Sequence, residues 1–125
     1  MAAGVGITTM RALLEDLDYR PGDATLIYRI SCTEDAILRT ELDQLAARRG
    51  ARVIYVEGPR APRVSWLPRQ LAHLSDADAL RWMVPELDAH DVFLCGPLSW
   101  MDNVRHALGE GDVPPEHIHV EEFAW

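Results

Sequence analysis

Residues 24–58 have the sequence ATLIYRISCTEDAILRTELDQLAARRGARVIYVEG, which predicts a strand, a helix and a second strand. The opening stretch ATLIYRI and the closing stretch ARVIYVEG are rich in β-branched and aromatic side chains. Between them, apolar residues recur at helical spacing from Glu34 to about Arg49, and Gly50 stands where helices commonly end. Two apolar strands joined by a helix are typical of a parallel sheet that is covered on both faces.

The alternation of strands and helices extends on both sides of this unit. The patterns predict a helix over residues 8–18, a loop with a short helical turn over residues 59–75, a helix over residues 76–83, a strand over residues 91–96, a helix over residues 98–109 and a strand over residues 117–123. Only residues 1–3 precede the first glycine, so the first strand is predicted to be truncated. We therefore predict a doubly wound, Rossmann-like α/β domain with a mostly parallel sheet and helices on both faces.

The length and charge of the chain exclude several classes of function. The 125 residues predict one domain over residues 1–125. Twelve basic residues against twenty acidic ones give a net charge of −8, which argues against nucleic-acid binding and against attraction to an anionic membrane. No stretch reaches the roughly 18 apolar residues of a membrane span. All twelve basic residues are arginines, so neither lysine Schiff-base chemistry nor a phosphate-loop lysine is available.

Metal-ligating patterns are weak in this sequence. The two cysteines, Cys32 and Cys95, form neither a CxxC nor a zinc pattern, so we expect free thiols in a reducing cytoplasm. His117, His119 and Glu121 alternate along a predicted strand and share a face that could ligate a metal. An ordinary polar strand face explains the same alternation, and we predict no metal site.

A glycine-containing turn, AGVGIT at residues 3–8, leads directly into the first predicted helix. Two glycines allow the backbone to approach a ligand closely, and the start of a helix offers its N–H groups to a phosphate. Thr8 or Thr9 adds a hydroxyl donor. The stretch also fits a tight turn without a ligand, and the dinucleotide-binding pattern G-x-G-x-x-G is incomplete because Thr9 stands at its last position.

A second candidate site is LCGP at residues 94–97, where a predicted strand gives way to a helix. Open α/β sheets bind ligands at this carboxyl edge. Cys95 is small and polarizable, Gly96 removes a side chain, and Pro97 suits the first position of a helix. A buried structural cysteine is the alternative interpretation. The chain ends in HVEEFAW, and the terminal Trp125 either packs on its own domain or stacks on a flat cofactor.

The AGVGIT turn, the CGP motif and the aromatic C-terminus, in this order and near these separations, resemble the pyridine-nucleotide-binding half of the ferredoxin–NADP reductase family. The similarity includes IYRISCTEDAILRTEL, SWLP and the closing PPEHIHVEEFAW, and it runs over essentially the whole chain. It is strongest toward the bacterial ferric-reductase-like and oxygenase-reductase branches. The resemblance implies that NAD(P)H binds across the carboxyl edge of the sheet. Its hydride would pass to a flavin, FAD or FMN, held by a separate β-barrel domain or subunit, which is expected to be missing from this chain.

The resemblance also implies roles for individual residues. The pyrophosphate and the nicotinamide ribose would be lined by Gly4, Val5, Gly6, Ile7 and Thr8, with Thr9 standing where the family usually has proline. Cys95, Gly96 and Pro97 would lie under the nicotinamide, with Cys95 near the reacting carbon. Glu121 matches an acidic residue that orders the nicotinamide end, and Trp125 matches a terminal aromatic residue that covers the flavin and moves aside for the nicotinamide.

The residues that select the adenosine end follow the second strand in this family. Here that region carries Arg29 and Ser31, which are candidates for binding a 2′-phosphate and favour NADP(H) over NAD(H). A solvent-facing strand residue is the alternative for Arg29. Arg60 and Arg63, in the loop after the next strand, are weaker candidates for a phosphate contact.

We expect an NAD(P)H-binding module of a flavin-dependent oxidoreductase, inactive without a flavin domain. It would be cytoplasmic, or the cytosolic part of a membrane reductase system. The alternative is a non-catalytic remnant or interaction module that retains the fold. The truncated first strand favours this alternative, whereas the intact CGP motif and Trp125 argue against it. A response-receiver regulator would need an aspartate at a strand end, and the predicted strand ends carry none.

Overall fold

A computed structural model describes residues 1–121 of the chain, and residues 122–125 lie outside the described part. The strands are β1 (Ala2–Ala3), β2 (Thr25–Ile30), β3 (Arg52–Glu57), β4 (Val92–Cys95) and β5 (Ile118–Glu121), and the α-helices are α1 (Ile7–Asp16), α2 (Arg39–Arg49), α3 (Asp76–Met83) and α4 (Leu98–Glu110). Short 3-10 turns cover Gly4–Gly6, Thr33–Asp35, Arg69–Leu71, Leu87–Ala89 and Pro115–His117. The sheet has the strand order β3-β2-β1-β4-β5, and each neighbouring pair is parallel. The predicted α/β class is confirmed.

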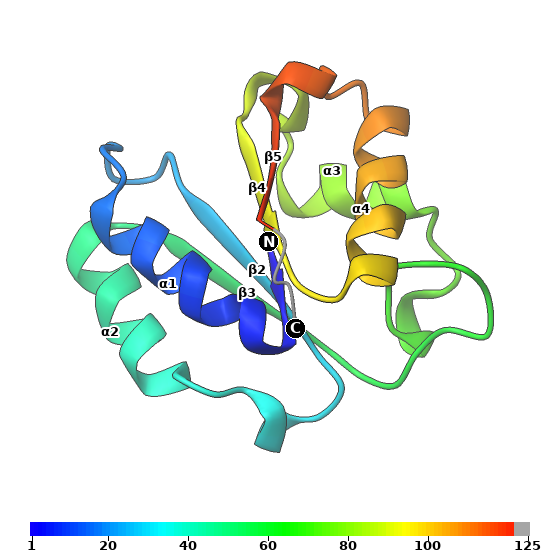
Figure 1. Cartoon of the computed structure of the whole chain (residues 1–125), viewed down its shortest axis with the longest axis horizontal. Coiled ribbons are helices and arrows are strands. Elements are labelled where there is room, and N and C mark those ends of the chain that lie inside the picture. Colours follow the sequence, from blue (N-terminus) through cyan, green and yellow to red (C-terminus); the bar gives the residue numbers. More distant parts are fainter. Residues whose placement is uncertain (122–125) are drawn as a thin grey trace.

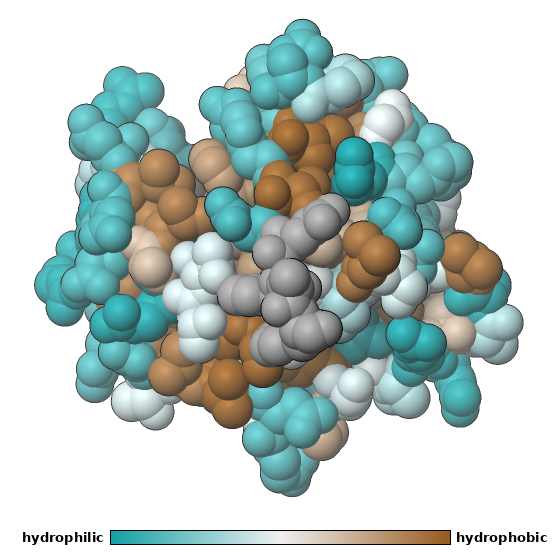
Figure 2. Space-filling model, viewed as in Figure 1, coloured by the Kyte–Doolittle hydropathy of each residue, from teal (hydrophilic) through white to brown (hydrophobic). Residues whose placement is uncertain are grey.

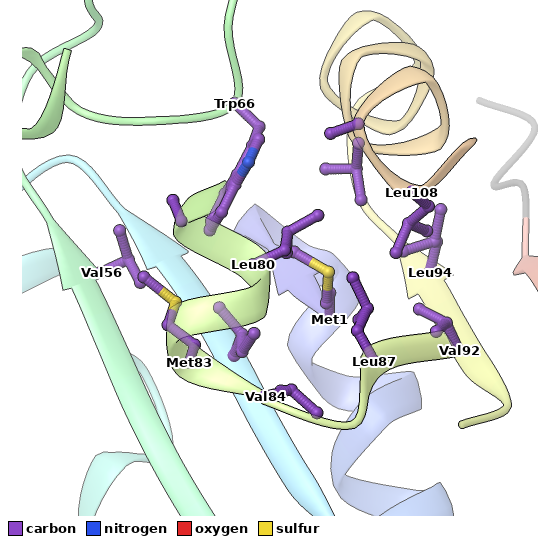
Figure 3. Close-up of a cluster of buried hydrophobic side chains, with 14 of the residues drawn as sticks. Met1, Val56, Trp66, Leu80, Met83, Val84, Leu87, Val92, Leu94 and Leu108 are labelled. Carbon is purple, nitrogen blue, oxygen red and sulfur yellow. The ribbon is translucent and has the colours of Figure 1, made fainter. Parts of the chain in front are cut away.

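Helices cover both faces of this sheet, with α1 and α2 on one side and α3 and α4 on the other (Figure 1). The cause is the alternation of side chains along each strand. Leu26 belongs to the buried cluster that contains residues of α1 and α2, whereas Ile27 belongs to the cluster that contains residues of α3 and α4. Cys95 and Leu94 divide in the same way. Figure 3 shows the cluster that contains residues of α3 and α4. Trp66, from the loop before α3, belongs to this cluster.

The central strand β1 has only two residues, as the sequence predicts. Ala2 is in register with Tyr28 of β2 and with Cys95 of β4. Met1 extends this pairing, because its α-amine donates to the Phe93 carbonyl at 2.6 Å and its carbonyl accepts from the Cys95 N–H at 3.1 Å. Beside Met1 lies a hollow of about 570 Å³, lined largely by apolar residues from α1, β2 and β4.

The predicted helix over residues 34–49 is wrong in its first part. A 3-10 turn covers Thr33–Asp35, and α2 begins only at Arg39. Leu38 has a φ of +63°, in the left-handed region, so a helix cannot run through it. Ile37 fits a helical spacing in the sequence, yet its side chain is 46% exposed and outside the helix. The apolar residues at helical spacing therefore predicted a helix that begins too early, because Ile37 is not part of the buried face.

The other predicted elements are confirmed with small shifts at their ends. The strand predicted over residues 117–123 is observed as β5 up to Glu121, and its last two residues lie outside the described part. Among residues 1–121, no helix has the length and apolar character needed to span a membrane. Figure 2 shows hydrophilic residues over much of the face that it draws, with hydrophobic residues gathered in patches between them.

Candidate functional site

Two turns that are far apart in the sequence meet at the carboxyl edge of the sheet. The turn Gly4–Gly6 joins β1 to α1, and Gly96–Pro97 joins β4 to α4. A Cβ atom added to Gly6 would lie 2.1 Å from the carbonyl oxygen of Cys95. A Cβ atom added to Gly96 would lie 3.1 Å from the carbonyl oxygen of Ala3 and 2.9 Å from the ring of Trp100. Both glycines are therefore required for the packing of one turn on the other.

Gly4 has a different reason to be glycine. Its φ is +56°, a left-handed conformation that side chains disfavour, and a Cβ atom there would meet nothing within 4 Å. The backbone of the turn is thus open to solvent on this side. The helix that follows has no side-chain cap and no acidic residue in its first turn, and the same holds for α4. Helix starts without a side-chain cap or a carboxylate suit an anionic or polar ligand, and in α1 the Ile7 N–H already donates to the main-chain carbonyls of Gly4 and Val5.

A groove of about 1,000 Å³ lies along this edge. Seven residues that the sequence analysis singled out line it: Gly4, Val5, Arg29, Ser31, Arg60, Arg63 and Pro97. Residues 60–67 of the long loop between β3 and α3 also line the groove, and this segment is called the loop wall below. Residues of α4 such as Trp100 complete the lining. The structure thus brings the glycine turn, the end of β2 and the start of α4 together around one groove.

Other predicted site residues do not line the groove. They are Gly6, Ile7, Thr8, Thr9, Cys95 and Gly96. The Ile7 side chain and the Cys95 thiol are fully buried in the cluster with α1 and α2, and the Thr8 hydroxyl donates to the Val5 carbonyl at 3.0 Å. Burial raises the pKa of the Cys95 thiol, and a hydrogen bond with Thr9 acts in the opposite direction. Cys95 is therefore a neutral thiol at neutral pH.

Arg29 is buried, not solvent-facing. Its side chain is 8% exposed, and it donates to the main-chain carbonyls of Trp66, at 3.1 Å, Val56, at 3.4 Å, and Ile30. Burial lowers the pKa of the guanidinium from its ordinary value, and the nearby Arg60 charge acts in the same direction. These hydrogen bonds use Nε and Nη1, whereas Nη2 forms none with the described residues. Arg29 therefore ties the loop wall to the sheet and retains unused donors beside the groove.

The loop wall depends on Asp76, which the sequence analysis did not single out for function. The Asp76 carboxylate, at the start of α3, accepts hydrogen bonds from Arg63, Ser65 and the main-chain N–H of Trp66. In the sequence analysis, the SWLP stretch at residues 65–68 counted only as part of the family resemblance. Nothing in the sequence indicates that Asp76 is its anchor.

The C-terminal candidates are only partly described. Glu121 is the last described residue, is exposed, and lies in register with Cys95 on the neighbouring strand. Trp125 falls outside the described residues. His119 contacts Asp91 at 3.1 Å and stacks on Phe93, and residues 1–121 contain no group of three or more His, Cys, Asp or Glu side chains arranged to hold a metal. Cys32 and Cys95 are both free thiols.

A ligand-sized groove across the carboxyl edge of a doubly wound parallel sheet, beside two uncapped helix starts, is typical of α/β domains that bind nucleotides. Comparison with known proteins agrees with this class. The family model described as "Oxidoreductase NAD-binding domain" matches residues 1–106. The chain belongs to this family, and the resemblance to the ferredoxin–NADP reductases is confirmed.

Several relatives are similar over almost the whole chain. The ferredoxin reductase component of 3-ketosteroid-9-alpha-monooxygenase from Mycobacterium tuberculosis is 32% identical, over 98% of this chain and 32% of that protein. A flavohemoprotein from Bordetella pertussis is 29% identical, over 98% of this chain and 31% of that protein. The chain thus spans about a third of the length of these relatives.

A solved structure with the same fold is the flavohem-like FAD/NAD-binding domain of nitric oxide dioxygenase from Vibrio cholerae. It superposes with a TM-score of 0.70 at 27% identity, over 98% of this chain and 48% of that one. This match confirms the all-parallel five-stranded sheet flanked by helices, and the family supports oxidoreductase-type NAD(P) binding for the chain.

Proposed function

We propose that the groove binds a pyridine dinucleotide and that the chain positions its nicotinamide ring for hydride transfer to a flavin held by another domain or subunit. The observation that carries this proposal is the place of the groove. It follows the carboxyl edge of the sheet, between the open turn at Gly4 and the start of α4 at Pro97, within the segment that the family model matches. Ligands of doubly wound domains bind in this position.

The residues around the groove suit such a ligand. The open turn at Gly4 and Val5, which line the groove, would hold the pyrophosphate, because the helix start that follows this turn carries no side-chain cap and no carboxylate in its first turn. Pro97 and Val5 offer flat apolar contacts, and the CGP turn would support the nicotinamide from beneath. Cys95 would contribute a small, uncharged group under that ring, in keeping with its raised pKa.

The bound nucleotide would supply a hydride, a transfer that needs two rings held face to face with water excluded rather than a strong acid or base. The chain's part in this step is binding, orientation and exclusion of water. Glu121 would order the nicotinamide end, and Trp125 would cover the flavin and yield to the nicotinamide, as the family resemblance implies. Alone, the chain is expected to bind nucleotide and to leave NADPH unoxidised, because it offers no acceptor group.

We further propose a preference for NADP(H). Arg29 and Arg60 line the groove, and neither forms an ion pair with a described residue. Two unpaired guanidinium groups near one another in a chain of net charge −8 favour an anion between them, such as a 2′-phosphate. The competing feature is a pair of carboxylates, Glu34 and Asp35, which also line the groove. Carboxylates there would bind ribose hydroxyls, which is the arrangement expected for NAD(H).

Calorimetric titration of the purified chain with NADP⁺ and NAD⁺ tests both proposals. We expect saturable binding of NADP⁺ and weaker binding of NAD⁺, because only NADP⁺ carries the 2′-phosphate. An absence of binding at millimolar concentrations of either nucleotide would contradict the proposed function and favour an interaction module. Tighter binding of NAD⁺ would remove only the preference for NADP(H).

The variant Arg60→Gln is expected to bind NADP⁺ about ten- to thirtyfold more weakly, since it loses one charge-assisted contact with the phosphate. Its affinity for NAD⁺ should stay unchanged. Arg52→Gln serves as the matched control, because Arg52 is an exposed arginine at the first position of β3, at the opposite edge of the sheet. An equal loss of affinity for both nucleotides in Arg60→Gln would show that Arg60 does not read the 2′-phosphate.

A further inference from the structure

We propose that Asp76, which does not line the groove, is a positioning residue for nucleotide binding, because it fixes the loop wall that carries Arg60. The inference rests on the proposed function, since it concerns the affinity of the same groove. It assigns a role to a carboxylate at the start of α3 that is not among the residues lining the groove.

The contacts of Asp76 converge on one short segment of the loop. Its Oδ1 accepts from Arg63 Nη1 at 3.1 Å and from Ser65 Oγ at 2.6 Å, and its Oδ2 accepts from the Trp66 main-chain N–H at 3.3 Å. Its main-chain carbonyl accepts from Trp66 Nε1 at 3.1 Å. One residue of α3 therefore holds three loop residues, through side-chain and main-chain atoms together.

The environment of this carboxylate makes the contacts hard to replace by water. The Asp76 side chain is 16% exposed and its partner Arg63 is 41% exposed. Arg63 is held at both of its Nη atoms, because Nη2 also donates to the carbonyls of Ala72, at 3.3 Å, and Leu74, at 2.7 Å. Although Arg63 lines the groove, its guanidinium serves the loop and is not free for a phosphate. Replacing one carboxylate oxygen of Asp76 by an amide NH2 would set a donor against a partly buried donor and would remove the counter-charge of Arg63.

Trp66 is where the two anchors of the wall meet. Its carbonyl is held by Arg29 from the sheet, and its N–H and indole N–H are held by Asp76 from α3. Its ring is 1% exposed and packs in the core shown in Figure 3. Two residues after this anchor, Pro68 forms an isolated bridge with Arg60, and the Arg69 N–H donates to the Pro59 carbonyl at 2.8 Å. The position of Arg60 relative to the groove therefore depends on how firmly Trp66 is held.

The test is a double-mutant cycle read as nucleotide affinity. Asp76→Asn keeps the volume of the side chain and removes its charge. We expect it to weaken NADP⁺ binding about five- to tenfold and NAD⁺ binding by less, so that the NADP⁺/NAD⁺ preference falls. In an Arg60→Gln background, Asp76→Asn should add little, because the group that it positions is already gone. The matched control is Asp78→Asn on the same helix, whose carboxylate pairs with Arg81 at the surface and is expected to leave both affinities unchanged.

Each variant is first shown by circular dichroism to be folded at the assay temperature. Where Asp76→Asn does not fold, Arg63→Gln carries the same test, since it removes the counter-ion from the more exposed side of the pair. An unchanged NADP⁺ Kd in the folded variant overturns the inference. An equal loss of affinity for NADP⁺ and NAD⁺ that persists in the Arg60→Gln background also overturns the inference, because a purely structural role of Asp76 would produce that result. If wild-type chain binds neither nucleotide, the proposed function fails first and this inference falls with it.

Discussion

Gly6→Ala is expected to lower the free energy of unfolding by about 3 kcal/mol or more. The added methyl group would lie 2.1 Å from the oxygen and 2.4 Å from the carbon of the Cys95 carbonyl. Both are main-chain atoms, so they can give way only if β4 moves from β1. The φ of Gly6 is −58°, which alanine adopts readily, so the loss would come from the contact and not from the backbone conformation. Urea unfolding followed by circular dichroism measures the change.

Gly109→Ala is the matched control for this variant. Gly109 lies inside α4, and a Cβ atom there would meet nothing within 4 Å. Alanine in a helix interior is favoured over glycine by up to about 1 kcal/mol, so this variant is expected to be slightly more stable than wild type. If the two glycine variants unfold at the same urea concentration, the close packing of the two turns is wrong.

The second large effect is expected in the dependence of stability on pH. Burial lowers the pKa of the Met1 α-amine from 8.0 to about 5, against a smaller opposing influence of Cys95. Between these two pH values the unfolded chain holds a proton that the folded chain has released. For the chain that begins at Met1, the free energy of unfolding should therefore rise with pH across this window, by roughly 4 kcal/mol in total, and level off above it.

Acetylation of the α-amine isolates this effect, because every other titratable group remains. The hollow beside Met1, about 570 Å³ in volume, has room for the acetyl group, and the acetylated nitrogen still donates to Phe93. Urea unfolding at several pH values between 5 and 8 should show a much shallower slope for the acetylated chain. Equal slopes for the two chains would mean that the amine is not the titrating group.

Local sequence patterns were sufficient to predict most of the fold. The apolar strands and amphipathic helices, and hence the parallel sheet, follow from side-chain periodicity alone. The start of α2 could not be predicted in this way. It is determined by the left-handed conformation of Leu38, and leucine is not a residue type that indicates such a conformation. Ile37 carries an apolar side chain at a helical spacing but lies exposed outside the helix, so periodicity misled at this point.

The site was predictable in place but not in detail. Carboxyl ends of parallel strands lie at one edge, so the turn after β1 and the turn after β4 had to come together, and the contact between Gly6 and Cys95 realises this. The hydrogen bond from Arg29 to the Trp66 carbonyl could not be foreseen, since Trp66 lies in a loop that follows the next strand. The same holds for Asp76, whose partners lie ten to thirteen positions earlier in the chain. Contacts of irregular loops leave no periodic trace in the sequence.

The contact between the two glycine turns has a consequence for protein engineering. A side chain at position 6 would strike the Cys95 carbonyl, and a side chain at position 96 would strike the Trp100 ring and the Ala3 carbonyl. A library meant to alter nucleotide choice should therefore leave this pair constant. It should instead diversify Val5, Ser31 and Arg60, which line the groove from three separate segments. A chimera made with a relative should likewise take both turns from the same parent protein, because the turn at Gly6 packs directly on the main chain at Cys95.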